Sequence, residues 1–132
     1  MKTHISKIFN FSMAHRLTFH NGKCRNLHGH TYKLEITISG DINKNGIIID
    51  FGDLKEIVIK NIIDKLDHST AIYEKDSLLL TNFPKVLKYN IFPYETTAEN
   101  LSKWIFDQLT KLLKIEKVRL WETPSNQVTY TK

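Results

Sequence analysis

The chain lacks most of the features that would point to export or to a membrane. It has a single cysteine, Cys24, among 132 residues, so no disulfide can form within it. We therefore expect a reduced thiol and a cytoplasmic location. The first residues carry no apolar leader, and no run of about 18 uncharged apolar residues follows. We expect neither export nor contact with a membrane.

Internal repeats, low-complexity segments and linkers are also missing. The length, with 41% hydrophobic and 25% charged residues, is typical of one globular domain that has its own core. We expect a single domain over residues 1–132.

Positive charge is in excess but is not concentrated. The chain has 19 Lys and Arg against 14 Asp and Glu, which gives a net charge of +5, and its lysines form no dense basic block. No nucleic-acid-binding motif accompanies them, so we expect no nucleic acid partner. The positive field favours anionic ligands in general, and a polyphosphate substrate is one of these.

Two long segments alternate apolar and polar residues as half-buried strands do. In residues 3–15 the odd positions are mainly apolar, and in residues 28–39 the even positions are. His15 shares the apolar parity of the first segment, and His28 and His30 share that of the second. Strand residues two apart point to the same side of a sheet. We therefore expect the three imidazoles to lie on the core face at two strand ends, where they can converge.

Two amphipathic helices are predicted further along the chain. Asp53 is expected to cap the first, which runs to about Leu66, and Thr97 to cap the second, which ends near Leu113. The shorter predicted elements are strands at 47–50, 86–92, 118–122 and 127–131 and a helical turn at 77–81. This order favours an antiparallel α+β domain that carries both helices on one face of its sheet.

Three imidazoles that leave one coordination position open are the ligand set of a catalytic zinc site. Zinc is the first choice for His15, His28 and His30, although iron, copper and nickel also accept imidazole. Cys24, in the polar segment 22–26, is either a fourth ligand, which would make the site structural, or a separate catalytic group. Spacing alone leaves both interpretations open. A hydrolase that uses metal-bound hydroxide and a non-catalytic zinc-binding module are the alternatives from other functional classes.

Further polar residues can also carry chemistry. Asp67 can orient His68 and stabilise its charged form, which gives a proton relay, although a polar helix end explains the pair equally well. Glu122 would be an unusual carboxylate on the core face of its strand, because a buried charge requires a partner such as the N–H groups of a ligand. Thr97 and Glu99 have an ordinary explanation as the start of a helix.

The motifs at 11–17, 24–30, 49–51, 66–68, 96–100 and 121–123 resemble, in order and spacing, the 6-pyruvoyltetrahydropterin synthase and 6-carboxytetrahydropterin synthase family. The resemblance covers nearly the whole chain. The roles that it implies are zinc binding by His15, His28 and His30, catalysis by Cys24, Asp67 and His68, and pterin binding by Glu122 with Thr97 nearby. It also implies the tunnelling fold, a four-stranded antiparallel sheet with two helices packed on one face. The implied assembly is a homohexamer, a dimer of trimers with active sites at subunit interfaces.

The short spacer between Cys24 and His28 bears on the reaction. Its three residues resemble the bacterial 6-carboxy enzymes of queuosine biosynthesis, whereas the pyruvoyl enzymes of tetrahydrobiopterin synthesis tend to carry a longer insertion. The resemblance therefore implies a lyase that converts 7,8-dihydroneopterin triphosphate to 6-carboxy-5,6,7,8-tetrahydropterin and releases acetaldehyde and triphosphate. The nearest alternative is 6-pyruvoyltetrahydropterin synthase, which eliminates triphosphate.

Overall fold

Two strands of 13 residues each, β1 (Thr3–His15) and β2 (His28–Gly40), run through the centre of the molecule. The computed structural model describes residues 2–132. The two strands pair antiparallel along their whole length, and the register sets His15 opposite His28 and Met13 opposite His30. Both strands were predicted from their alternating pattern, and the prediction is confirmed.

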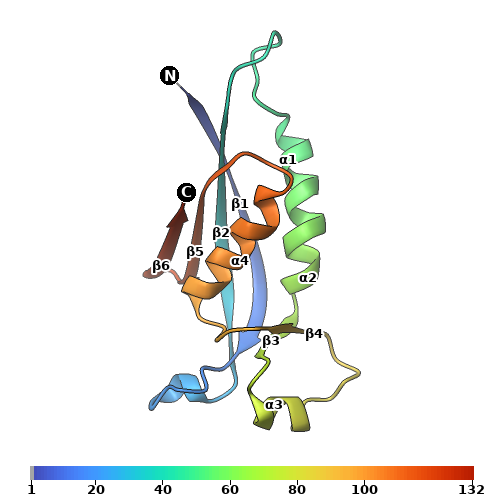
Figure 1. Ribbon diagram of the computed structural model, residues 1–132, viewed down its shortest axis with the longest axis vertical. Helices are drawn as coiled ribbons and strands as arrows, with labels where there is room; N and C mark the ends of the chain where they lie inside the picture. Colours follow the sequence, from blue (N-terminus) through green and yellow to red (C-terminus); the bar gives the residue numbers. More distant parts are fainter. Residues whose placement is uncertain (1) are drawn as a thin grey trace.

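The sheet has six strands in the order β4-β3-β1-β2-β5-β6, with the helices beside it (Figure 1). The strands β1, β2, β5 (Ile115–Thr123) and β6 (Asn126–Thr131) form an antiparallel set. The expected count of four strands is wrong. Two shorter strands, β3 (Ser69–Tyr73) and β4 (Tyr89–Phe92), extend the sheet beyond β1, and they pair in parallel.

The strand β3 has no counterpart among the predicted elements. Its four buried residues are Ser69, Thr70, Ala71 and Ile72, two polar and then two apolar, so neither burial nor polarity alternates along the strand. A short strand buried on both faces lacks the period-two pattern from which β1 and β2 were predicted. The strand β4 begins at Tyr89, three residues after the predicted start, because Val86 and Leu87 lie exposed in the turn before it.

The first helical segment consists of α1 (Phe51–Val58), a π-helical stretch η2 (Ile59–Ile63) and α2 (Asp64–Leu66). Its cap is Asp50, whose side chain accepts a hydrogen bond from the Gly52 N–H at 2.7 Å. The prediction of a cap at Asp53 is therefore wrong by one turn. The predicted strand at 47–50 is also absent, because Asp50 begins the helix and Ile48 and Ile49 pack against the core without joining the sheet.

The second long helix, α4 (Ala98–Thr110), begins as predicted. The Thr97 hydroxyl accepts a hydrogen bond from the Asn100 N–H at 3.2 Å. Helix α4 ends at Thr110, about one turn before the predicted end. The remaining helical pieces are η1 (Lys23–Arg25) and α3 (Ser77–Asn82), of which the second was predicted as a helical turn. No helix between residues 2 and 132 has the length and hydropathy needed to cross a membrane.

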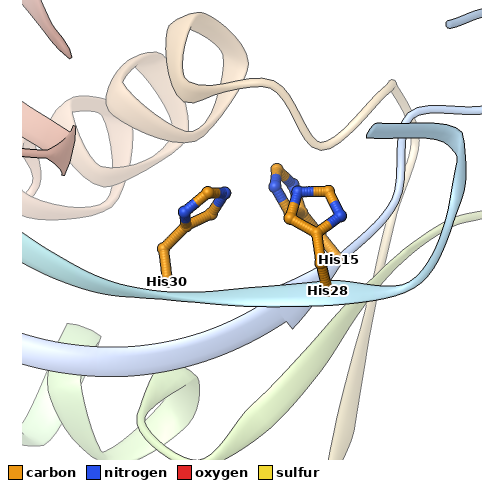
Figure 2. A group of neighbouring side chains, drawn as sticks. All are labelled: His15, His28 and His30. Carbon is orange, nitrogen blue, oxygen red and sulfur yellow. The ribbon is translucent and has the colours of Figure 1, made fainter. Parts of the chain in front are cut away.

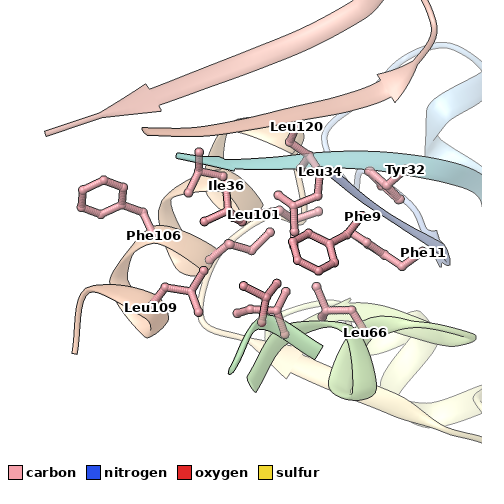
Figure 3. Packing of buried hydrophobic residues seen from close by; sticks show 14 of the residues in the cluster. Phe9, Phe11, Tyr32, Leu34, Ile36, Leu66, Leu101, Phe106, Leu109 and Leu120 are labelled. Carbon is pink, nitrogen blue, oxygen red and sulfur yellow. The ribbon is translucent and has the colours of Figure 1, made fainter. Parts of the chain in front are cut away.

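One hydrophobic cluster joins the two long helical segments to a single face of the sheet (Figure 3). The odd positions of β1 and the even positions of β2 point into it, as the alternating pattern predicted. The helical contributions recur at intervals of four residues, as expected for one buried face of a helix. They are Leu54, Val58, Ile62 and Leu66 from the first segment and Leu101, Ile105 and Leu109 from the second. This packing holds the ends of β1 and β2, and the histidines on them, against the start of α4.

Candidate metal centre and active site

Three histidines meet where β1 ends and β2 begins. Figure 2 shows the rings of His15, His28 and His30 on the same side of the two strands. One nitrogen from each ring lies within 4.8 Å of the other two. They share the face of the hydrophobic core, because His15 has the parity of Phe11 and Met13. The structure thus brings together the three residues for which the sequence predicted convergence.

Backbone carbonyls orient two of the three rings. His15 Nδ1 lies 2.7 Å from the Thr96 carbonyl oxygen, and His28 Nδ1 lies 2.7 Å from the Asn26 carbonyl oxygen. A carbonyl oxygen only accepts hydrogen bonds, so Nδ1 of each neutral ring carries the hydrogen and Nε2 keeps its lone pair. The sequence did not single out Thr96 and Asn26 for this role, because a main-chain carbonyl has no residue-type signature.

The inward-facing nitrogens have no hydrogen-bond partner among the described residues. The Nε2 atoms of His15, His28 and His30 are all buried and unpaired within residues 2–132. A buried polar atom without a partner costs roughly 1–3 kcal/mol. Three such lone pairs beside one another are the donor set that a zinc ion accepts, with a fourth position left for another ligand. The residues present therefore fit a metal ion of the kind that imidazole binds.

Burial favours the neutral, metal-binding form of two of the rings, those of His15 and His30. It lowers the pKa of His15 below its usual value, and the Thr96 carbonyl and the Glu122 carboxylate oppose that shift only in part. Burial likewise lowers the pKa of His30, again against the attraction of Glu122. Metal ions compete with protons for imidazole, so a depressed pKa favours metal binding near neutral pH.

Glu122 reaches the same place from β5. Its Oε1 lies 3.5 Å from His30 Nε2, and its Oε2 lies 3.9 Å from His15 Nε2. A cavity of about 260 Å³ adjoins the carboxylate, and Thr97 and Val128 also line it. Glu122 and Thr97, which were predicted as substrate-binding residues, therefore line one cavity, and the Glu122 carboxylate also lies close to His15 and His30.

Cys24 lies in η1, within the loop that joins β1 to β2, and its side chain is partly exposed. Its carbonyl oxygen accepts a hydrogen bond from the Leu17 N–H at 2.8 Å. Among residues 2–132, the group whose ligand atoms lie close enough to share a metal ion consists of the three histidines and does not include this thiol. The arrangement therefore favours a separate role for Cys24 over that of a fourth ligand.

Asp67 and His68 form a second polar group beside β1. Asp67 Oδ1 accepts a hydrogen bond from the Ser12 N–H at 2.8 Å, and the His68 N–H donates to the Ser12 carbonyl at 2.7 Å. His68 has a φ of 59°, and its Nδ1 lies 3.0 Å from Asp67 Oδ1. The left-handed backbone lets adjacent side chains meet, which they seldom do within a strand. The Ser12 N–H, followed by His68, lowers the pKa of Asp67.

This pair does not join the three histidines within one chain. The exposed His68 lines a broad hollow of about 650 Å³ together with Ser12, Ala14 and Thr31. Those three residues have the opposite strand parity to the core, so this part of the hollow lies on the other face of the sheet, although His30 also lines the hollow. The structure therefore separates the predicted residues into a histidine group with Glu122 and a group around Asp67.

Comparison with known proteins places these residues in a family. The family model described as 6-pyruvoyl tetrahydropterin synthase matches residues 4–132. This chain belongs to that family. A 6-carboxy-5,6,7,8-tetrahydropterin synthase from Haemophilus influenzae is 47% identical, with 96% of both chains covered. The resemblance drawn from the sequence motifs is thereby confirmed.

Two further members of the 6-pyruvoyl tetrahydropterin synthase family are informative. A 6-pyruvoyl tetrahydrobiopterin synthase from Dictyostelium discoideum is 39% identical over 83% of this chain and 73% of its own. The structure of Caenorhabditis elegans 6-pyruvoyl tetrahydropterin synthase superposes with a TM-score of 0.74 at 25% identity, covering 100% of this chain and 96% of that one. The family therefore has the same α+β architecture, and its members carry names for two different products.

Proposed function

We propose that this chain is a zinc-dependent 6-carboxy-5,6,7,8-tetrahydropterin synthase of queuosine biosynthesis. Its substrate is 7,8-dihydroneopterin triphosphate, which with one water gives the carboxypterin, acetaldehyde and triphosphate. The observation that carries the proposal is the convergence of three buried, unpaired imidazole nitrogens close to Glu122, which lines a cavity. The name of the Haemophilus relative and the three-residue spacer after Cys24 favour the carboxy product.

The metal site and the substrate cavity would bind different parts of the substrate. Zinc held by His15, His28 and His30 would supply Lewis acidity toward oxygens of the substrate side chain. The Glu122 carboxylate would accept hydrogen bonds from the ring N–H and amino groups of the pterin, with Thr97 beside it. That interaction would satisfy the charge that Glu122 places next to the buried histidines.

Proton transfer is assigned to Cys24 and to the Asp67–His68 pair. Asp67 would hold the imidazole through Nδ1, and the side chain of His68, which is 82% exposed, would exchange protons through its other nitrogen. Because this pair lies on the opposite face of the sheet from the histidines, a neighbouring subunit would supply it. A homohexamer with active sites at subunit interfaces meets this requirement.

Product analysis tests the reaction. Zinc-loaded protein is incubated with 7,8-dihydroneopterin triphosphate, and the products are identified by mass spectrometry together with assays for acetaldehyde and triphosphate. We expect carboxypterin and acetaldehyde in equal amounts. Triphosphate with a pyruvoyl product and no acetaldehyde would instead establish the activity for which the Dictyostelium relative is named.

A further inference from the structure

The side chain of Arg16, directly after His15, bridges two segments that lie far apart in the sequence. Its Nε donates to Asp76 Oδ2 at 2.8 Å and its Nη2 to Asp76 Oδ1 at 3.3 Å. Its Nη1 donates to the carbonyl oxygen of Arg25 at 2.7 Å. One guanidinium thus joins the residue that follows Cys24 to the residue that precedes α3. Both segments lie at the same end of the molecule (Figure 1).

The acidic partner of this bridge is almost fully buried. The side chain of Asp76 is 2% exposed and that of Arg16 is 15% exposed. Asp76 also caps α3, because its Oδ1 accepts a hydrogen bond from the Leu79 N–H at 3.2 Å. A two-pronged contact between guanidinium and carboxylate has a fixed geometry, so Asp76 determines where the guanidinium of Arg16 lies. The buried carboxylate of Asp76 therefore anchors the guanidinium, whereas no residue of α3 itself is buried.

The segment at the other end of the bridge has little else to hold it. None of the three residues of η1 is buried, so apolar packing does not fix the position of Cys24. The turn is closed internally by hydrogen bonds from Arg25 N–H to the Gly22 carbonyl and from Asn26 N–H to the Lys23 carbonyl. Two hydrogen bonds tie it to the chain that follows His15: the Leu17 N–H donates to the Cys24 carbonyl, and Arg16 Nη1 donates to the Arg25 carbonyl.

We propose that Arg16 is a positioning residue for Cys24, holding the turn that carries the thiol against α3 through Asp76. The proposal rests on the catalytic role assigned to Cys24 in the proposed function. It gives Arg16 a role distinct from that of His15 next to it, because Arg16 orients the proton carrier and His15 holds the metal. The guanidinium itself does not contact the substrate in this assignment.

Local hydrogen exchange and kinetics of Arg16→Gln test the proposal. We expect amide exchange in residues 22–27 to accelerate about tenfold or more, while exchange in β2 and α4 stays unchanged. We expect kcat to fall by about tenfold to a hundredfold with KM changed by less than about threefold, since misplacing a reacting group costs that much. Zinc content should stay at the wild-type value, and Arg16→Lys should recover part of kcat.

Alkylation of the only cysteine provides an independent readout. The rate at which iodoacetamide modifies Cys24 should change in Arg16→Gln. The matched control is Asp107→Asn, which removes the exposed ion pair between Asp107 and Lys103 and should leave the rate unchanged. Because exchange and alkylation need no pterin, they test the bridge even if the product assay finds a different reaction.

Asp76→Asn serves as a second variant, because asparagine can still cap α3 but cannot form the charged two-pronged contact. It should change the amide exchange rate of residues 22–27, the alkylation rate of Cys24 and kcat in the same direction as Arg16→Gln does. Wild-type exchange in residues 22–27 in both variants would overturn the proposal. A fall in kcat that only follows loss of zinc or of folded protein would also overturn it. If Arg16→Gln does not fold, amide exchange in residues 22–27 of Asp76→Asn tests the proposal: faster exchange supports it, and wild-type exchange overturns it.

Discussion

At the scale of single residues, the spacer between Cys24 and His28 contributes through its backbone. The Arg25 carbonyl accepts from the Arg16 guanidinium, and the Asn26 carbonyl fixes the ring of His28. Two of the three spacer residues therefore link the turn that carries Cys24 to Arg16 and to the ring of His28. An insertion here would separate the position of the thiol from the orientation of the metal ligand, which gives a physical reason for the spacer length to matter.

The proposed roles, proton transfer by Cys24 and zinc binding by the three histidines, can be tested separately. Cys24→Ala should lower kcat by at least about a hundredfold, because a positioned acid–base group contributes roughly that much. Its zinc content per chain, measured by atomic emission after dialysis, should stay at the wild-type value. His30→Gln, as the matched comparison, should lose zinc. Loss of zinc from Cys24→Ala would show that the thiol is a fourth ligand, and retained activity would favour a metal hydrolase.

At the scale of elements, two aspartates near the start of α1, Asp50 and Asp53, should contribute differently to its stability. Asp50→Ala should reduce the free energy of unfolding by about 1 kcal/mol, because it removes the hydrogen bond to the Gly52 N–H. Asp53→Ala should have a smaller effect, since Asp53 contributes only its charge near the positive end of the helix. Urea denaturation of both variants measures the difference. A larger loss of unfolding free energy for Asp53→Ala would show that Asp53 caps the helix, as the sequence predicted.

The elements that the sequence predicted share a strong periodic signal. Strand β1 has its odd residues in the core and β2 its even ones, so both strands and the face of their histidines followed from alternation. Strand β3 is too short and too evenly buried to show alternation. Two aspartates three residues apart both suit a helix start, and only the backbone geometry selects Asp50.

Strand parity predicted the arrangement of some site residues, and the arrangement of the others depends on contacts between distant segments. The histidines and Glu122 follow from strand parity, because each has the side-chain direction of a core residue. The separation of Asp67 and His68 from them depends on the pairing of β3 with β1, which the sequence did not reveal. The carbonyls of Thr96 and Asn26 and the bridge from Arg16 depend on distances between segments that no local pattern encodes.

At the scale of the whole molecule, the two faces of the sheet carry different parts of the proposed chemistry. His15 and Glu122 lie on the helix-covered face, and His68 lines the hollow whose other lining residues include Ser12, Ala14 and Thr31 of the opposite face. In the proposed function, the His68 that a substrate bound at the three histidines meets belongs to another copy of the chain. The proposed homohexamer allows this, because the opposite face of one copy can meet the metal site of another.

Mixing two inactive variants tests that arrangement. His28→Gln lacks a metal ligand and His68→Ala lacks the proton carrier, so each should be nearly inactive alone. If active sites are shared between subunits, co-refolding equal amounts should restore about a quarter of wild-type activity, the fraction of intact sites expected from random assembly. Mixing His28→Gln with His30→Gln is the control and should restore nothing. No recovery in the first mixture would place the whole site within one chain.

The pairing of β1 with β2 has a consequence for folding. The loop between them spans residues 16–27, too long to impose a register in the way that a tight hairpin turn does. A slip of one residue would carry His28 and His30 to the far side of the sheet, away from His15. Only the correctly aligned ribbon presents three nitrogens to one ion. Metal binding would therefore stabilise the native strand register and would not stabilise a register shifted by one residue.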